Sequence, residues 1–245
     1  MAETFRFRLQ QIANALLAPV GLRLLRRERA FDMHGLLARA GTRGFAPGTV
    51  IDVGASDGIW SLRAHRHFPR AHYLLFEPLV ERHAALTRLK ARKGFDFVPA
   101  VAGAQPGSIS LNVDPALDGS SVSVSPGAPS HRTVPMETID AAISARSLPG
   151  PYCLKLDTHG YEIPVLSGAA NVLNQTELLI IEAYNFQLTP DCLRFHELCA
   201  WLEARGFRCC DLADPMRRPN DGALWQMDLA FAPATSPLFK SNRYD

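Results

Sequence analysis

Two acidic stretches contain the residues of this chain whose types and spacing could carry out chemistry. In the first, between Thr49 and Gly58, Asp52 and Asp57 flank a glycine turn that follows an apolar run. Nineteen residues beyond Gly58, a second apolar run ends in Glu77. Strand, glycine turn, helix, strand and acid, in this order, form a nucleotide-binding α/β crossover, in which the acid after the second strand can bind ribose hydroxyls.

The charges around the glycine turn indicate which nucleotide it would bind. A dinucleotide-binding turn requires glycines at three set positions, so that backbone amides can approach a pyrophosphate. Ser56 and Ile59 occupy the second and third of these positions. Asp52 and Asp57 would repel a pyrophosphate and attract a cation. The turn therefore favours S-adenosylmethionine, which carries a positive sulfonium and an α-amino group, over NAD. The alternative is an acid-rich turn with a purely structural role.

Specific contacts with this cofactor follow from the layout of the crossover. We expect Gly54 to lie against the methionine part, Asp52 near the amino group and Glu77 on the ribose hydroxyls. The full set of expected cofactor-binding residues is Asp52, Gly54, Ala55, Ser56, Gly58, Glu77, Pro78 and Val101.

The second acidic stretch supplies candidates for the acceptor side. In a doubly wound sheet, ligands bind where the winding reverses, at the carboxyl ends of the first and fourth strands, which here are Asp52 and Asp157. Asp157, His159 and Glu182 are the candidates for a catalytic base that accepts the proton of a hydroxyl group. The alternatives are a helix N-cap for Asp157 and an exposed turn position for His159.

Two further interpretations concern the same strand ends. Lys155 lies inside an apolar strand, where an unpaired charge would be costly, and Glu182 is its natural partner. A divalent metal held by Asp157, Glu182 and Asp211, which end neighbouring strands, is another way to activate an acceptor. Because strand ends are often acidic for other reasons, we expect no metal.

Alternating strands and helices from residue 49 onward position these residues. The alternation predicts an α/β fold, a Rossmann-like, doubly wound, seven-stranded and mostly parallel sheet with helices on both faces. The last two strands follow each other without a helix and predict an antiparallel hairpin at the sheet edge. We expect strands at 49–53, 72–77, 96–102, 152–157, 178–183, 206–211 and 225–231, and helices at about 58–68, 79–93, 138–146, 161–174 and 190–205.

Residues 103–135 interrupt this pattern and are rich in Gly, Ser and Pro, with one short strand expected at 108–113. A loop of this length in a compact domain is usually functional or disordered. We expect residues 114–135 to form a lid on the acceptor side, with Ser120, Ser121 and His131 touching the substrate. A plain solvated loop is the alternative.

Composition excludes several classes of function. The 245 residues are 47% hydrophobic, which suits one enzyme-sized domain. A net charge of +2 gives no strong field for nucleic acid, and no apolar run approaches the ~20 residues that span a membrane. The five cysteines lack metal-type spacing and indicate free thiols in a reducing compartment. We therefore expect a cytoplasmic protein with a small-molecule acceptor; the resemblance described below extends this expectation to a glycan.

Residues 1–45 form a basic helical extension, with eight arginines against three acids. Phe5, Leu9, Ile12 and Leu16 fall on one helical face. Such a helix can lie on a membrane surface, but more often it packs across a domain edge. After this extension we expect a single domain over residues 46–245.

Several motifs, taken in their order along the chain, resemble those of the FkbM-type methyltransferases. The resemblance spans about residues 50–185. The motifs are Asp52-Val53-Gly54-Ala55, Phe76-Glu77-Pro78, Gly119-Ser120-Ser121, Glu137-Thr138-Ile139-Asp140, the run from Leu154 to Glu162, the run from Val165 to Ala169, and Ile181-Glu182. Many members carry an acid before the glycine of the Lys-x-Asp-x-x-Gly motif, where this chain has His159.

The resemblance implies a class I methyltransferase fold and an S-adenosylmethionine-dependent enzyme that methylates a hydroxyl of a sugar or sugar-containing metabolite. The alternative is another small-molecule acceptor, with metal assistance or without a sugar. A nucleic-acid base as acceptor is disfavoured, because the turn after Asp157 is not the Asn-Pro-Pro-aromatic sequence common in amino methylation of bases. The matched region also lacks a basic patch that would follow phosphates.

Overall fold

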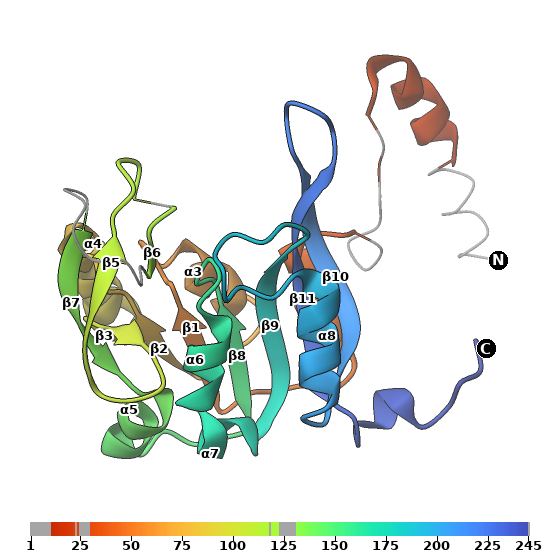
Figure 1. The fold of residues 1–245 in the computed structure, drawn as a ribbon. Helices are drawn as coiled ribbons and strands as arrows, with labels where there is room; N and C mark the ends of the chain where they lie inside the picture. The colour runs from red at the N-terminus through yellow and green to blue at the C-terminus, as the bar shows by residue number, and fades with distance from the viewer. Residues whose placement is uncertain (1–10, 23, 25–29, 118, 123–130, 245) are drawn as a thin grey trace.

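The computed structural model describes residues 11–22, 24, 30–117, 119–122 and 131–244. A seven-stranded sheet has the strand order β10-β11-β9-β8-β1-β2-β3 (Figure 1). β11 is antiparallel to both of its neighbours, and the other paired strands are parallel. This confirms the predicted doubly wound, mostly parallel sheet with a C-terminal antiparallel hairpin. The strands are β1 (Thr49–Val53), β2 (His72–Phe76), β3 (Asp96–Val98), β8 (Tyr152–Leu156), β9 (Thr176–Tyr184), β10 (Phe207–Arg217) and β11 (Leu224–Pro233).

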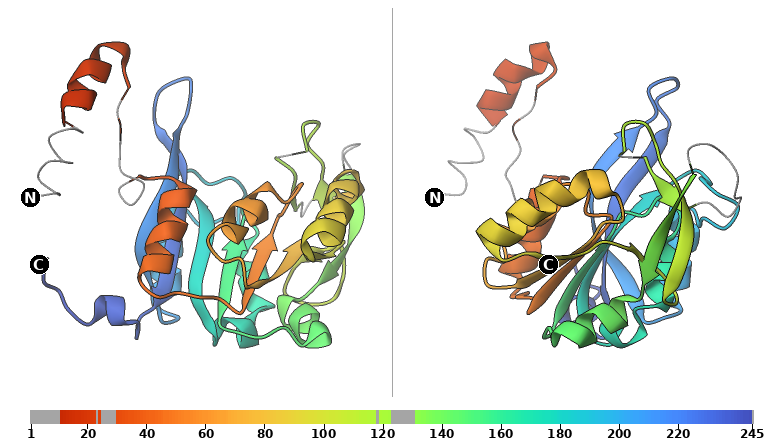
Figure 2. Two further views of the ribbon diagram at one scale, coloured as in Figure 1. Left: turned by 180° about the vertical axis from the view of Figure 1, so that it is seen from behind. Right: turned by 90° about the vertical axis from the view of Figure 1, so that its left-hand side faces the viewer.

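Helices cover both faces of this sheet. Figure 1 shows one face with α6, α7 and α8 in front, and the left view of Figure 2 shows the other face with α2, α3 and α4. Core residues of α5 pack on the same side as those of α6, α7 and α8. The helices are α2 (Met33–Thr42), α3 (Ile59–His65), α4 (Val80–Lys93), α5 (Ile139–Arg146), α6 (Glu162–Ser167), α7 (Ala170–Leu173) and α8 (Phe195–Glu203).

The strands divide their side chains between two core clusters. In β1, Ile51 and Val53 pack with the α5–α8 side, whereas Val50 packs with the α2–α4 side. Because alternate residues of a strand point to opposite faces, Asp52 lies on the α2–α4 side with Val50. Its carboxylate there accepts a hydrogen bond from the hydroxyl of Ser61 in α3.

A second, four-stranded sheet lies beside the first, with the order β4-β7-β5-β6. Its strands are β4 (Val101–Ala102), β5 (Gly107–Asn112), β6 (Ser121–Val122) and β7 (His131–Glu137). The predicted strand at 96–102 was wrong as one element, because Pro99 has no N–H for a ladder and the chain changes sheets there. The interpretation of 103–135 as a loop with one strand was also wrong, since β6 and β7 pair with β5.

The predicted helix at 161–174 is divided into α6 and α7 around Gly168. A Cβ at Gly168 would overlap the backbone carbonyl of Gly103, so the chain needs glycine where these two segments cross. The predicted helix at 190–205 begins later, at Phe195.

The basic extension has two parts in the structure. α2 is part of the core, because Met33, Leu36 and Leu37 are at most 2% exposed. Ile12 and Leu16 are exposed, at 60% and 75%, while Phe5 and Leu9 lie outside the described residues. The domain boundary near residue 45 therefore stays a prediction. Across the described ranges, no helix combines the length and apolar character that a membrane crossing requires.

Candidate active site

A pocket of about 460 Å³ opens at the carboxyl ends of β1, β2, β8 and β9. The second sheet closes one side of it with Leu111, Leu117, Ser120 and Val122. The ends of β1 and β8 are neighbours because these strands pair in register, from Thr49 with Tyr152 to Val53 with Leu156. The pocket therefore lies at the reversal of winding that the sequence predicts.

The glycine turn after β1 forms the first wall of the pocket. Gly54 has φ +77°, and a Cβ there would overlap the backbone carbonyl of Asp157. Its N–H and that of Ala55 donate to the carbonyl of Phe76, at 3.1 and 3.0 Å. Only glycine allows the two strand ends to approach so closely. Gly54 thus brings the turn after β1 against the turn after β8 at the wall of the pocket.

Glu77 holds the same turn from the end of β2. Its Oε2 accepts from the N–H of Ser56 and its Oε1 from the N–H of Leu79, both at 2.8 Å. Burial raises the pKa of Glu77 to about 7, although the two backbone hydrogen bonds oppose this shift. The carboxylate is only 5% exposed and faces the pocket.

The predicted cofactor residues divide into two groups. Five line the pocket, namely Gly54, Ser56, Glu77, Pro78 and Val101. Asp52 is fully buried and bonded to Ser61, so the structure does not place it where we expected, beside a donor amino group. Ala55 belongs to the α2–α4 core cluster, and Gly58 is the N-cap of α3.

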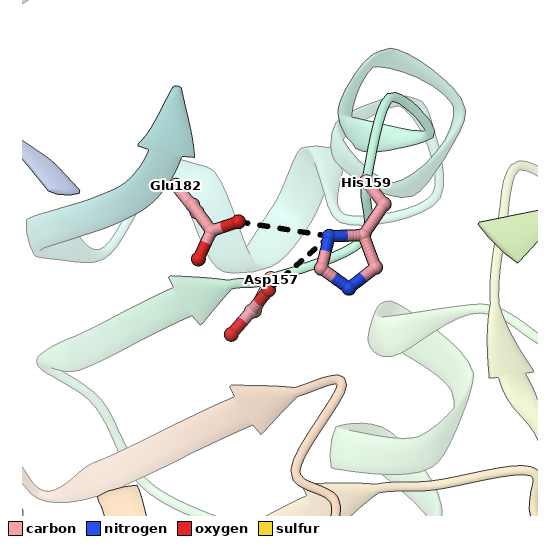
Figure 3. Close-up of side chains that lie close together, drawn as sticks. All are labelled: Asp157, His159 and Glu182. Atoms are coloured by element: carbon pink, nitrogen blue, oxygen red, sulfur yellow. Dashed lines mark ion pairs between the residues drawn. The ribbon is translucent and has the colours of Figure 1, made fainter. Parts of the chain in front are cut away.

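Asp157, His159 and Glu182 lie together at the opposite wall (Figure 3). His159 Nδ1 is 3.8 Å from Asp157 Oδ1 and 3.6 Å from Glu182 Oε1. The hydroxyl of Tyr184 lies 2.8 Å from His159 Nδ1 and donates to Glu182 Oε1. The three predicted catalytic side chains thus face one another from the segment that follows β8 and from β9.

Lys155 is buried behind this cluster. Its Nζ lies 2.8 Å from Asp157 Oδ2 and 3.8 Å from Asp52 Oδ1. Burial acts to raise the pKa of Asp157, but Lys155 and His159 together outweigh it and hold that pKa below its usual value. The expected partner of Lys155, Glu182, makes no ion pair with it among the described residues. Asp157 takes that place because it follows Lys155 by two positions.

Strand alternation brings four charged side chains to one face. Asp52, Lys155, Glu182 and Asp228 lie on the same face as residues of the α2–α4 cluster, and Asp228 is the register partner of Glu182 across β11 and β9. Together with Asp157 they form what we call the polar layer. Burial raises the pKa of Asp228 to about 7.

Asp211 does not belong to this group. Its carboxylate pairs with Arg39 at 2.7 Å and with Arg43 at 3.7 Å, both from the α2 segment. The alternative metal site that included Asp211 is therefore wrong. Asp211 is near the start of β10, the end of the strand opposite to the pocket.

Of the predicted substrate residues, Ser120 lines the pocket, where its Oγ donates to the carbonyl of Leu117 and accepts from the N–H of Asp114. Ser121 pairs with Asn112 in the second sheet and faces a different hollow. His131 begins β7 and is not in the pocket wall.

Sequence reasoning missed several pocket residues. Tyr184 follows Glu182 by two positions in a strand, and this spacing alone could have predicted that both face the site. Tyr161 and Gln226 also line the pocket. Gln226 could not be found in this way, because its position depends on the register of β11 against β9.

The fold and the pocket define a class of protein, the class I methyltransferases that use S-adenosylmethionine. Within this class the chain belongs to the FkbM methyltransferase family, since the model of the methyltransferase FkbM domain matches residues 52–209. Residues 52–209 are therefore a methyltransferase domain. No curated protein sequence matches the chain significantly.

Solved structures with a similar fold include three methyltransferases. The FkbM methyltransferase of Methylobacillus flagellatus is 15% identical with a TM-score of 0.49, over 78% of this chain and 46% of that one. This chain thus spans less than half the length of that relative. A putative RNA methyltransferase of Pyrococcus horikoshii is 14% identical, with a TM-score of 0.46 and 82% of each chain covered. Magnesium protoporphyrin IX methyltransferase of Synechocystis, with its donor bound, is 10% identical, with a TM-score of 0.46 over 81% of this chain and 76% of that one.

Proposed function

We propose that this enzyme transfers a methyl group from S-adenosylmethionine to a hydroxyl oxygen of a sugar or a sugar-containing metabolite. One observation carries the proposal. A single pocket joins the turn at Gly54 and Glu77 with the cluster of Asp157, His159 and Glu182. A donor site and a group that can activate a hydroxyl thus share one cavity.

Residues of the glycine turn and of β2 bind the donor in this proposal. A carboxylate oxygen can accept more than one hydrogen bond, so Glu77 can hold the turn amides and accept ribose hydroxyls at the same time. Gly54 leaves its backbone open to the methionine part of the donor. Pro78 and Val101 supply apolar contacts for the adenine ring.

The protein has to align the reacting atoms and to exclude water. When bound, the donor supplies an electrophilic methyl group on a sulfonium sulfur. Positioning of the acceptor against it can contribute about 7–11 kcal/mol. A sugar hydroxyl is a weak nucleophile, and it reacts faster when a nearby group removes its proton or polarises its oxygen. Asp157, His159 and Glu182 are placed for this task.

The acceptor side of the pocket suits a polar ring with apolar faces. Tyr161 and Tyr184 offer aromatic surfaces, and Ser120 and Gln226 offer hydrogen-bonding groups. Aromatic rings with a polar group at one end contact both the carbon face and the hydroxyls of a sugar. This mixture supports a sugar acceptor over a purely apolar one.

The cellular location is part of the same proposal. All five cysteines are free thiols in the structure, and the exposed Cys209 and the half-buried Cys199 are not paired. Thiols of this kind persist in a reducing compartment. We therefore place the enzyme in the cytoplasm, acting on a small molecule or glycan and not on nucleic acid.

Label transfer tests the proposed reaction. The purified chain is incubated with methyl-labelled S-adenosylmethionine and, separately, with sugar nucleotides, glycolipids and glycosylated metabolites. We expect label on an ether oxygen of one acceptor class, identified by mass spectrometry. Transfer only to nitrogen or carboxylate acceptors would contradict the proposal.

Calorimetry tests the donor site independently. Glu77→Ala removes charge-assisted hydrogen bonds worth about 1.5–3 kcal/mol each, so donor binding should weaken at least tenfold. Glu81→Ala is the matched control, because Glu81 is an acid four residues further on that lies outside the pocket wall. Unchanged donor binding in Glu77→Ala would show that the donor pocket is wrongly assigned.

A further inference from the structure

We infer that Asp157, His159 and Glu182 bind a divalent metal ion that holds the acceptor hydroxyl. The inference rests on the proposed transfer of a methyl group to a hydroxyl, and it names the group that activates the oxygen. The cluster differs from the metal site considered from sequence, because the imidazole of His159 takes the place of the Asp211 carboxylate.

The geometry of the three side chains suits a small cation. One ligand atom from each side chain can be chosen so that all lie within 4.8 Å of one another. Figure 3 shows the imidazole of His159 directed at both carboxylates, with Nδ1 3.8 Å from Asp157 and 3.6 Å from Glu182. Metal bonds of about 2.1 Å separate adjacent ligand atoms by about 3.0–3.4 Å, which small side-chain rotations would reach.

An orphaned oxygen in the cluster is the second observation. Asp157 Oδ1 is buried and, among the described residues, has no hydrogen-bond partner. The other oxygen of the same carboxylate is 2.8 Å from Lys155 Nζ. Lys155 therefore fixes the carboxylate with Oδ1 toward His159 and Glu182. A buried carboxylate oxygen without a partner points to a ligand that completes it.

The charge around the cluster favours a cation. Within the described part of the chain, Lys155 is the one lysine or arginine that forms an ion pair with Asp52 or Asp157, and none pairs with Glu182 or Asp228. One ammonium thus serves several carboxylates in the polar layer. Buried charges require compensation, and a divalent ion at Asp157 and Glu182 would supply it.

The Tyr184 hydroxyl takes part in a hydrogen-bonded arrangement that is the alternative to a metal site. It lies 2.8 Å from His159 Nδ1 and donates to Glu182 Oε1. A hydrogen-bonded relay from His159 through Tyr184 to Glu182 would need this hydroxyl. A metal site would not need it, because the cation itself would bridge Nδ1 and the carboxylates.

One imidazole and two carboxylates suit Mn²⁺, Fe²⁺ or Zn²⁺ better than an all-oxygen cation. The acceptor hydroxyl oxygen would bind the cation as a further ligand, and its proton would pass to solvent water. The oxygen then forms a bond to the donor methyl carbon as the carbon–sulfur bond breaks. The electron pair of that bond stays on sulfur, so S-adenosylhomocysteine leaves as the neutral thioether.

Manganese binding tests the site without any turnover. The full-length chain is dialysed against EDTA and titrated with Mn²⁺, while free Mn²⁺ is followed by electron paramagnetic resonance. We expect one saturable site, weakened at least tenfold in Asp157→Asn, His159→Ala and Glu182→Gln. His196→Ala and Glu203→Gln, exposed on α8, serve as controls and should bind like the wild type. No saturable site, or a site that the three variants leave intact, would overturn the inference.

Donor binding by calorimetry shows whether each variant is folded. His159→Ala is the safest variant in this respect, because it leaves the ion pair between Lys155 and Asp157 intact. If Asp157→Asn does not bind the donor, it is treated as misfolded, and the Mn²⁺ affinities of His159→Ala and Glu182→Gln decide whether the metal site exists.

Tyr184→Phe separates the metal site from the relay. We expect Mn²⁺ affinity in this variant to stay within about threefold of wild type. Loss of Mn²⁺ binding equal to that in His159→Ala would overturn the inference.

Chelation distinguishes failure of the metal site from failure of the proposed function. Label transfer that continues at the full rate in EDTA would overturn the metal site and leave O-methylation standing. Tight Mn²⁺ binding without label on any hydroxyl acceptor would support the metal site and overturn the proposed function. We expect EDTA to abolish transfer and Mn²⁺ to restore it, with donor binding retained throughout.

Discussion

Lys155 shows how one buried residue supports the site. Its side chain is 5% exposed and lies 5.7 Å from the centre of the Trp60 ring. Burial acts to lower the pKa of Lys155, but Asp157 and Asp52 outweigh it and hold that pKa above its usual value. The ammonium therefore stays charged and links the core carboxylate of Asp52 to the pocket carboxylate of Asp157.

Replacing Lys155 with methionine should leave the buried carboxylate of Asp52 and the half-buried carboxylate of Asp157 without a cation. We expect Lys155→Met to lose about 3–5 kcal/mol of unfolding free energy at pH 7, measured by urea denaturation. Lys90→Met is the control, because Lys90 is 59% exposed and its pair with Asp96 is at the surface. Surface pairs contribute at most about 1 kcal/mol.

The pH dependence of the Lys155→Met effect has a definite sign. The pKa of Asp157 lies below its usual 3.8 in the folded protein, so its pairing stabilises the fold above that pH and the gain is lost as pH falls through the folded pKa. In the variant this gain is absent, and acid neutralises the unpaired carboxylates. The stability gap between wild type and variant should therefore narrow as pH falls below about 3.8, through the folded pKa of Asp157. A gap that widens in acid would contradict this account.

Glu77 gives a second pH prediction, for binding. With its pKa near 7, this carboxylate is partly protonated at neutral pH and accepts ribose hydroxyls better when ionised. Affinity for adenosine, which has no group titrating near pH 7, should rise from pH 6 to pH 8 by calorimetry. Glu77→Gln should remove the slope, and an equal slope in that variant would show that another group is responsible.

The same pKa also predicts how Glu77 affects the fold. A carboxyl whose pKa is raised from 4.5 to about 7 favours folding when protonated. That contribution is fully present below pH 4.5 and is lost as pH rises through about 7. Glu77→Gln should therefore gain stability relative to wild type above pH 7, measured by thermal unfolding.

From the sequence, site residues at the ends of strands were easier to predict than the hydrogen-bond partners of those residues. Asp157, His159 and Glu182 were found because they follow or end apolar runs. Asp52 belongs to the same pattern, yet it points into the core, since its position in β1 sets its face and Ser61 of α3 completes it. Ser61 reaches Asp52 only because α3 packs against β1, and the spacing of residues in the sequence does not predict this packing.

At the level of elements, the second sheet forms one side of the pocket. The segment between β5 and β6 carries Leu117 and Ser120 to the pocket wall. Leu117 has φ +71°, a conformation that a leucine rarely adopts. The lid expected from sequence thus includes a residue, Leu117, with a left-handed backbone conformation in the wall of the pocket.

Shortening this segment tests its role. Asn112 pairs with Ser121, so replacing residues 113–120 with Asn-Gly keeps the register of the two strands in a tight hairpin. We expect donor affinity to stay within about twofold of wild type and turnover to fall at least tenfold, measured by calorimetry and label transfer. Equal loss of both, or of neither, would contradict a lid.

Regular elements with apolar runs were predictable, and irregular ones were not. β1, β8 and β9 are mostly apolar and almost wholly buried, as central strands require. β7 was missed because Pro135 and its polar residues are typical of a loop. It forms a strand because β5 supplies a partner, and that pairing is a tertiary effect.

At the scale of the whole molecule, the N-terminal region separates into a part within the core and a part outside it. Removing residues 1–30 should leave the melting temperature and donor affinity unchanged, because the described side chains at Ile12 and Leu16 are exposed. Removing residues 1–42 should lower the melting temperature by 10 °C or more, since it deletes α2 and its buried leucines. Similar melting temperatures for both truncations would show that α2 is dispensable and would support a boundary near residue 45.

The position of β11 has a consequence for the synthesis of this protein. β11 follows every other described strand along the chain, yet it lies between β9 and β10 and pairs with β9 from Leu179 to Tyr184. Until residue 224 has been made, β9 is an edge strand with unpaired N–H and C=O groups beside Leu179, Ile180 and Ile181. A chain that stops before this point carries every residue of the glycine turn and the cluster of Asp157, His159 and Glu182, but its sheet stays open. We therefore expect premature termination to yield a truncated chain that aggregates through β9 and that cellular proteases have to degrade.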